Sequence, residues 1–265
     1  MRTASEQKRT NSLNDTWTLD YLVGHYLKAL DASDVKHQPF CYLFATDLFP
    51  SDVYSHLTKA MESVSGYKNL KHKDAMREDG SSTRQVIPFN EDYLGRMSES
   101  DREFFSLIKE VLDDERIGRK FFQLLLPGIQ ERKGKKKAED IIAFPKSGLF
   151  CDASGYKIRP HKDVRTKLVT TQMYLPTDAK QESFGTSLYT RSIKGRIIRE
   201  LNKISKTQRP EFEHLETFPF LPNSGYAFVV GDKSWHGREE IPEGMGNRYS
   251  LMNIYFEDKD VPFYD

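Results

Sequence analysis

The side chains with the clearest chemical potential in this 265-residue sequence are two histidines and an aspartate. His161 and Asp163 are separated by one residue, and His236 follows a short apolar run at 226–230. In an extended segment, residues i and i+2 point to the same side, so His161 and Asp163 can bind one ion. Two imidazoles and one carboxylate leave adjacent coordination positions open, an arrangement that suits non-haem Fe(II) sites. The sequence therefore predicts a metal site formed by His161, Asp163 and His236.

A His-x-Asp motif is weak evidence by itself. The same tripeptide occurs at 72–74, within a polar and turn-rich stretch, whereas the copy at 161–163 precedes a strand-like run at 167–175. We therefore interpret the first copy as a surface feature. A structural zinc site would need a fourth protein ligand, and the sequence offers no obvious one. The two cysteines, Cys41 and Cys151, are too few for a thiolate cage.

An arginine begins the last apolar run of the sequence. Residues 248–256 alternate so that Arg248 and Ser250 share one face of a strand. A buried cation is costly unless it is paired, and no acidic residue on that face of the strand can pair with it. A bound anion is therefore an attractive partner, and a guanidinium matches the shape of a carboxylate. Tyr174, in the run before it, is a candidate to donate its hydroxyl to the same carboxylate.

In chain order, the motifs are His161-x-Asp163, a run ending at Tyr174-Leu175, Gly185-Thr-Ser-Leu-Tyr189, Trp235-His236-Gly237 and Arg248-Tyr-Ser. This order resembles the 2-oxoglutarate/Fe(II) dioxygenase superfamily, and within it the spacing is similar to the prolyl-4-hydroxylase-like branch. The match covers about residues 140–258, and the strand-then-helix pattern at 40–64 also resembles that branch. The gap from His236 to Arg248 is a few residues longer than in many prolyl hydroxylases.

The resemblance implies a mainly β fold with N-terminal helices and a double-stranded β-helix (jelly-roll, cupin-like) core. It implies Fe(II) at the three ligands, with O2 as oxidant, and ascorbate is a candidate stimulant. The co-substrate 2-oxoglutarate would be held by Arg248, Tyr174 and Ser250. It would be decarboxylated to succinate and CO2 while a C–H bond is hydroxylated. Halogenating members typically replace the carboxylate by a small residue, so the presence of Asp163 favours hydroxylation.

The elements that must position these residues differ between the two halves of the chain. Apolar residues recur at helical spacing in four segments, 17–30, 51–64, 99–113 and 117–126. A strand-like run lies at 40–46, and alternating or apolar runs occupy 141–151, 156–160, 167–175, 186–190, 226–230 and 248–256. We predict one oxygenase domain over 1–265. Residues 1–139 form a mostly helical support, and 140–258 form the jelly-roll core with a helix-bearing lid insertion at about 177–222.

The composition restricts the partners. Forty basic residues against 39 acidic residues give a net charge of +1, which argues against nucleic-acid or membrane binding. No apolar run approaches the roughly 18 residues of a membrane span, and the first 15 residues lack an apolar signal core. We therefore expect a cytoplasmic protein with a small-molecule substrate. The oligomeric state is not indicated.

Three functions are compatible with these motifs. The first is an oxygenase acting on a small molecule, such as an amino acid, a natural-product intermediate or a sugar. The second is a prolyl-type oxygenase acting on a protein, and the third is a non-oxygenase, cupin-like metal-binding protein, which would not need Arg248. The basic residues within 192–209 are interpreted as a solvated helix face; a functional role for them would favour an anionic substrate. Candidate substrate contacts are Arg159, Arg165, Thr186 and Trp235.

Overall fold

Two antiparallel sheets form the centre of the computed structural model, which describes residues 16–72, 74–193, 197, 200–201 and 212–264. The larger sheet contains, in spatial order, β1 (Asp34–Lys36), β2 (Tyr42–Thr46), β10 (Ser224–Val229), β7 (Lys167–Leu175), β12 (Arg248–Phe256), β5 (Phe144–Asp152), β4 (Arg84–Pro88) and β3 (Lys68–Asn69). The smaller sheet contains β6 (Ile158–His161), β11 (Trp235–Arg238), β8 (Ser187–Arg191) and β9 (Phe212–Thr217). This arrangement confirms the predicted double-stranded β-helix fold.

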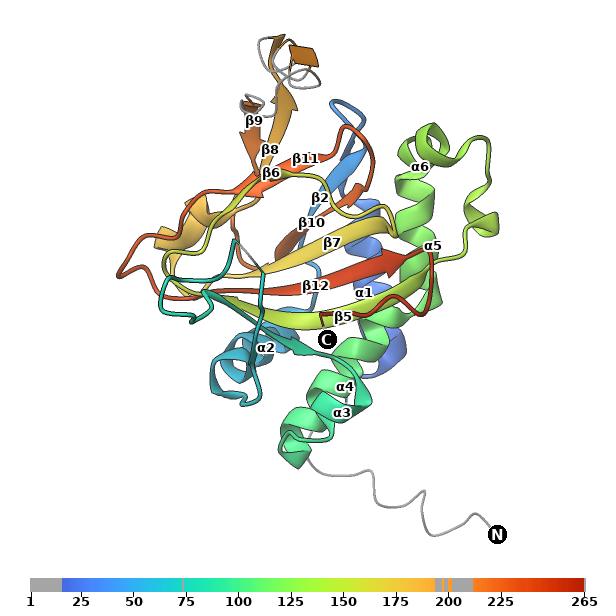
Figure 1. Cartoon of the computed structure of the whole chain (residues 1–265). Helices are drawn as coiled ribbons and strands as arrows, with labels where there is room; N and C mark the ends of the chain where they lie inside the picture. Colours follow the sequence, from blue (N-terminus) through green and yellow to red (C-terminus); the bar gives the residue numbers. More distant parts are fainter. Residues whose placement is uncertain (1–15, 73, 194–196, 198–199, 202–211, 265) are drawn as a thin grey trace.

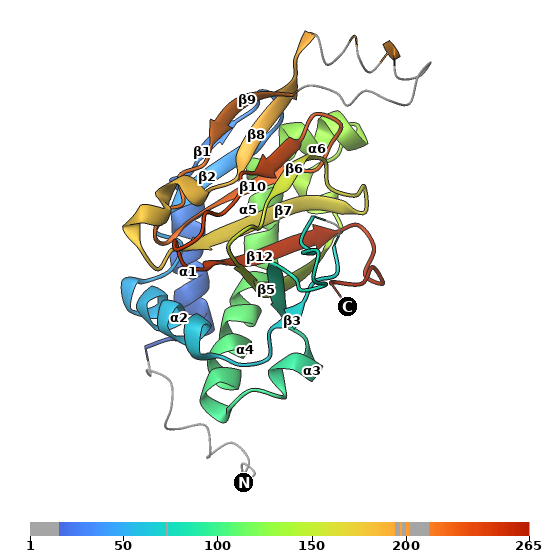
Figure 2. The ribbon, with the colours of Figure 1, turned by 60° about the vertical axis from the view of Figure 1, so that its left-hand side comes forward.

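Helices cover the outer face of the larger sheet (Figures 1 and 2). They are α1 (Leu19–Asp31), α2 (Ser51–Ser63), α3 (Glu91–Leu94), α4 (Glu99–Asp113), α5 (Glu115–Leu124) and α6 (Leu126–Lys133), with short 3-10 turns at Ala138–Asp140 and Ala179–Phe184. Side-chain oxygens cap four of the starts, those of α1, α3, α4 and α5; Thr18, for example, accepts from Tyr21 N and Ser98 from Asp101 N. No helix in the described part of the chain is long and apolar enough to cross a bilayer.

Three apolar layers hold these elements together, the smallest of which includes Val86, Phe150 and Phe263. The first lies between the helices and the larger sheet and includes Phe104, Phe105 and Leu251. The second is rich in aromatic residues and joins side chains of both sheets, among them Phe228 on β10 and Leu188 on β8. Because each fully buried side chain of this size contributes roughly 1.5–3 kcal/mol, the second layer holds the smaller sheet firmly over the larger one. The metal-site candidates lie at this junction.

The predicted elements match the structure closely where their patterns are long. β7, β12 and α4 have the predicted bounds. The structure adds seven helices and strands that were not predicted: β1, β3, β4, α3, α6, β9 and β11. Within the expected lid region 177–222, β8 and β9 are strands of the smaller sheet, and the helical pattern at 192–207 falls largely outside the described residues.

Candidate metal centre and adjoining cavities

His161 and His236 are direct neighbours across a pair of antiparallel strands. His161 is the last residue of β6, and His236 lies opposite it on β11. Their ring centroids are 4.3 Å apart. Asp163 follows in the loop between β6 and β7, and one ligand atom from each of the three residues lies within 4.8 Å of the others. The structure therefore brings together the three side chains that were predicted as a metal site.

Gly237 allows the close approach of the two strands that carry the histidines. The strand register shifts between His236 and Arg238, which marks a β-bulge. A Cβ atom at position 237 would lie 2.7 Å from the Ile158 carbonyl oxygen and 3.1 Å from the backbone of Pro160. A larger residue would force β6 away from β11, and the two imidazoles would separate with their strands.

Backbone carbonyls fix the orientation of both imidazoles. His161 Nδ1 lies 3.0 Å from the carbonyl oxygen of Arg159, and His236 Nδ1 lies 3.0 Å from that of Ser234. A carbonyl only accepts, so each Nδ1 carries the proton and each Nε2 keeps a free lone pair. Such bonds are the usual outer support of metal-binding histidines.

Asp163 is held by two donors on β7. Lys167 Nζ donates to Oδ1 at 2.7 Å, and Thr170 Oγ1 donates to Oδ2 at 2.7 Å. Burial alone would raise the pKa of Asp163, but Lys167 and the two histidines together outweigh this effect, and the pKa is lowered. The carboxylate therefore stays ionised and ready to bind a cation.

The donor set fits a ferrous ion. It consists of two neutral imidazole nitrogens and one ionised carboxylate oxygen, oriented before any metal binds. This set matches the two-histidine, one-carboxylate pattern of non-haem Fe(II) proteins. The metal candidate at 72–74 differs: the side chain of His72 is 55% exposed, and its carboxylate neighbour Asp74 is its only partner among the contacts of the described residues.

The depressed pKa values of the histidines make the metal-free fold sensitive to acid. Burial, reinforced by His236, lowers the pKa of His161 to about 3, and burial also lowers that of His236. Below pH 6.5 the unfolded histidine binds a proton that the folded one does not, so stability falls as the pH falls. The titration of His161 alone should lower the free energy of unfolding by about 2 kcal/mol between pH 6.5 and pH 5.

Urea unfolding of the chelator-treated protein at pH 7 and pH 5 measures this loss. His161→Gln should lose less stability than the wild type over the same interval, because glutamine does not titrate. An equal loss in both proteins would show that His161 is protonated in the folded state.

Arg248 is buried in a cavity that is also lined by the three metal-site residues. Its Nη1 donates to Asp152 Oδ2 at 2.9 Å and its Nε to the Phe184 carbonyl oxygen at 2.7 Å. The expectation that no acidic residue pairs with Arg248 is therefore wrong, because Asp152 lies directly opposite it on the neighbouring strand β5. One nitrogen, Nη2, has no hydrogen-bond partner among the described residues.

Two further arginines of this cavity were missed by the sequence reasoning. Arg84 on β4 forms an ion pair with Asp152 Oδ1, with its Nε at 3.2 Å. Arg238 on β11 is 6% exposed and donates through Nη1 to the Phe184 carbonyl oxygen at 2.8 Å. A signal for Arg238 existed, since it lies two residues after His236 and therefore on the same face of an extended strand.

The other predicted cofactor contacts lie nearby in the same interior. The Tyr174 ring lies 5.4 Å from the Arg248 guanidinium, and the Tyr174 hydroxyl accepts from Thr186 N at 3.0 Å. Ser250 Oγ accepts from Gln172 at 2.8 Å. All four neutral side chains are buried, and Thr186 and Gln172 line the cavity.

The remaining predicted substrate contacts lie away from that interior. Arg159 is exposed, and Arg165 forms an ion pair with Asp232 at 2.8 Å. Trp235 is half-buried and packs against Phe212, with ring centroids 4.7 Å apart. None of the three predicted contacts lines the cavity that contains the histidines, and their roles toward a substrate stay predictions.

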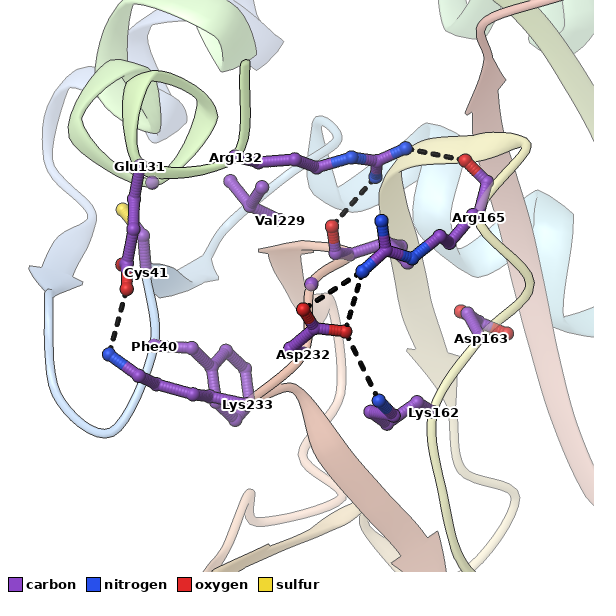
Figure 3. A pocket seen from close by; sticks show the side chains of 13 residues that line it. Phe40, Cys41, Glu131, Arg132, Lys162, Asp163, Arg165, Val229, Asp232 and Lys233 are labelled. Atoms are coloured by element: carbon purple, nitrogen blue, oxygen red, sulfur yellow. Dashed lines mark hydrogen bonds and ion pairs between the residues drawn. The ribbon is translucent and has the colours of Figure 1, made fainter. Parts of the chain in front are cut away.

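A second, larger cavity of about 470 Å³ borders Asp163 from the side of α6 (Figure 3). Its wall combines apolar residues such as Phe40 with ion pairs such as Arg165–Asp232. Arg132 of α6 donates through Nη1 to the carbonyl oxygens of Lys167 at 2.6 Å and Val230 at 2.7 Å, and through Nη2 to that of Arg165. This arginine therefore ties α6 to both loops that lead to the metal site.

Comparison with known proteins gives matches of structure but not of sequence. No protein-family profile matches the sequence, and no curated protein matches it. A prolyl hydroxylase from Trichoplax adhaerens, solved in complex with a hypoxia inducible factor oxygen degradation domain peptide fragment, is 12% identical, with a TM-score of 0.50 over 94% of this chain and 97% of that one.

Two further solved structures are similar. One comes from work on the prolyl 4-hydroxylases of Phytophthora capsici; it is 13% identical, with a TM-score of 0.49 over 96% of this chain and 70% of that one. The non-heme alpha ketoglutarate dependent epimerase SnoN from nogalamycin biosynthesis is 10% identical, with a TM-score of 0.47 over 93% and 88%. The sheet order and the first of these comparisons together show that the chain has a double-stranded β-helix fold, similar to that of the prolyl hydroxylase from Trichoplax adhaerens.

Proposed function

We propose that this chain is an Fe(II)- and 2-oxoglutarate-dependent oxygenase that hydroxylates an unactivated C–H bond of a small molecule, with release of succinate and CO2. The observation that carries the proposal is the convergence of His161, Asp163 and His236, with ligand atoms within 4.8 Å of one another. The cavity they line also contains the buried guanidinium of Arg248. A metal site alone would not require that cation.

The proposed site has two ends, a metal end at His161, Asp163 and His236 and an anion end at Arg248. His161, Asp163 and His236 would hold the iron, which supplies the binding and activation of dioxygen. Arg248 would bind the distal carboxylate of 2-oxoglutarate through Nη2, the nitrogen that has no hydrogen-bond partner among the described residues. Tyr174 and Ser250 are the proposed accessory contacts, since their hydroxyls lie in the same buried interior. The aromatic layer around them excludes water from this end.

A small-molecule substrate is supported by the second cavity. It adjoins Asp163, and its volume of about 470 Å³ lies within the range of roughly 300–1,000 Å³ that is usual for small-ligand pockets. Its wall carries side chains of both charges, Lys162 and Asp232 among them, which suits a polar substrate. Protein hydroxylation is the second candidate, supported by the peptide bound to the similar prolyl hydroxylase.

Succinate formation tests the proposal. Protein loaded anaerobically with Fe(II) is mixed with 2-oxoglutarate and O2, alone and with panels of amino acids, nucleotides, sugars and proline-containing peptides. We expect slow succinate release without a substrate and faster release with one member of the small-molecule panels. Stimulation by peptides alone would favour the protein hydroxylase. Fe(II) binding without any succinate would instead indicate a metal-binding protein that is not an oxygenase.

A further inference from the structure

The anion end of the cavity contains more positive charge than its acidic residues balance. Three arginines line the cavity as a whole, Arg84, Arg238 and Arg248, together with Lys167 and two carboxylates. Asp163 is paired with Lys167, so Asp152 is the one carboxylate left for the three guanidiniums among the described lining residues. Asp152 forms ion pairs with Arg84 and Arg248. No ion pair joins Arg238 to a described residue.

Arg238 and Arg248 are immediate neighbours. Arg238 Nη1 and Arg248 Nε both donate to the carbonyl oxygen of Phe184, at 2.8 Å and 2.7 Å. Arg238 is 6% exposed and Arg248 is 1% exposed, so water screens their mutual repulsion only weakly. Two adjacent buried cations around one neutral oxygen are costly unless an anion joins them.

The unused donors of the two arginines define where an anion would bind. Arg238 Nε and Nη2 and Arg248 Nη2 are buried without a hydrogen-bond partner among the described residues. Aromatic faces contact both groups, since Phe184 lies 5.3 Å from the Arg238 guanidinium and Phe220 lies 4.8 Å from that of Arg248. Such faces attract a cation but do not accept these N–H groups in the plane of the guanidinium. These three nitrogens can therefore donate hydrogen bonds to one ligand that carries several acceptor oxygens.

We propose that Arg238 and Arg248 together bind the distal carboxylate of 2-oxoglutarate, so that Arg238 is a second arginine of the co-substrate site. This inference rests on the proposed function, because it assigns one more residue to the same site. Two nitrogens of Arg248 donate hydrogen bonds to Asp152 and Phe184, whereas one nitrogen of Arg238 donates a hydrogen bond, to Phe184. Arg238 is therefore the arginine with the larger free donor set, and it selects a 2-oxo acid that carries a second carboxylate.

Substituting Arg238 with methionine separates ligand binding from folding. Arg238→Met removes a buried cation that repels its neighbour, so the ligand-free protein should be as stable as the wild type or more stable. Its affinity for 2-oxoglutarate should fall roughly 10- to 100-fold, the effect of losing charge-assisted hydrogen bonds. Calorimetric titration of the Mn(II)-loaded proteins without O2 measures the affinity, and thermal unfolding measures the stability. Arg238→Lys, which keeps the charge but not the fork, should bind with intermediate affinity.

A second ligand localises the effect to the distal carboxylate. The probe 2-oxovalerate has the same chain length and the same 2-oxo acid head but lacks the second carboxylate. We expect Arg238→Met to weaken binding of 2-oxoglutarate and leave that of 2-oxovalerate unchanged. The control Arg96→Met alters an arginine that pairs with Asp92 at the surface, where both side chains are 64% exposed. This variant should bind both probes as the wild type does.

The outcomes distinguish this inference from the proposed function. A wild type that binds neither probe contradicts the proposed function itself. A wild type that binds 2-oxoglutarate no more tightly than Arg238→Met overturns the role of Arg238 while the oxygenase proposal stands. Lower stability of Arg238→Met together with unchanged affinity of Arg238→Lys would also overturn it, because the arginine would then be a structural residue.

Discussion

Replacing Asp163 with alanine is expected to remove both Fe(II) binding and 2-oxoglutarate turnover. Asp163 supplies the only carboxylate within 4.8 Å of the two imidazoles among the described residues. Loss of an outer-shell partner of a ligand already costs about 10- to 100-fold in metal affinity, so loss of the ligand itself should cost more than about 100-fold. Metal content after anaerobic loading and succinate release in the presence of 2-oxoglutarate measure the two effects.

The chain contains its own control for this experiment. Asp74 belongs to the second His-x-Asp tripeptide and contacts His72 at the surface. Asp74→Ala should keep the full metal content and the full succinate yield. If Asp163→Ala retained iron and turnover while Asp74→Ala lost them, the assignment of the two copies would have to be exchanged.

Replacing Asp152 with asparagine is expected to destabilise the fold more than any surface substitution. The carboxylate is fully buried and forms ion pairs with Arg84 and Arg248, the second of which is 1% exposed. Removing one member of a buried charge pair costs about 3–5 kcal/mol, because the partner charge is left without compensation. For a protein of this size, that loss lowers the melting temperature by roughly 6–20 °C.

An exposed ion pair provides the comparison for Asp152. Asp232 is paired with Arg165, and their side chains are 69% and 80% exposed. Asp232→Asn should cost less than about 1 kcal/mol. Urea unfolding of both variants measures the difference, and equal stabilities would mean that the interior charges are balanced by some other group. We expect Arg248→Ala to lose stability as well as co-substrate affinity, because it would likewise leave a buried partner charge without compensation.

The convergence of His161, Asp163 and His236 could be predicted because the motif and the strand pattern agree. His161 ends the strand β6, Asp163 follows it two residues later in the loop, and His236 follows an apolar run that is the strand β10. The long alternating runs of β7 and β12 were predicted with the correct bounds for the same reason. The local periodicity of the sequence is therefore sufficient to predict the bounds of a strand that is long and has one dominant pattern.

The rest depended on strand register, which a single sequence does not reveal. Asp152 pairs with Arg248 because β5 and β12 are adjacent with these two residues opposite each other, and nothing in either segment indicates that alignment. β11 is four residues long, and its glycine hides the alternation. No strand was therefore predicted there, and Arg238 was not connected with His236. The predicted helix ended at 126 because the Pro-Gly pair at 127–128 is a usual helix stop, whereas in the structure Pro127 lies in the first turn of α6.

The contacts of Arg132 have a consequence for how such a protein can change during evolution. Through one guanidinium, a helix outside the barrel is joined to the chain on either side of the metal site, at Arg165, Lys167 and Val230. A small shift of that helix therefore moves the loop of Asp163 and the loop before His236 together. In this way, a substitution on α6 reaches the loops beside His161, Asp163 and His236 and leaves these three side chains unaltered.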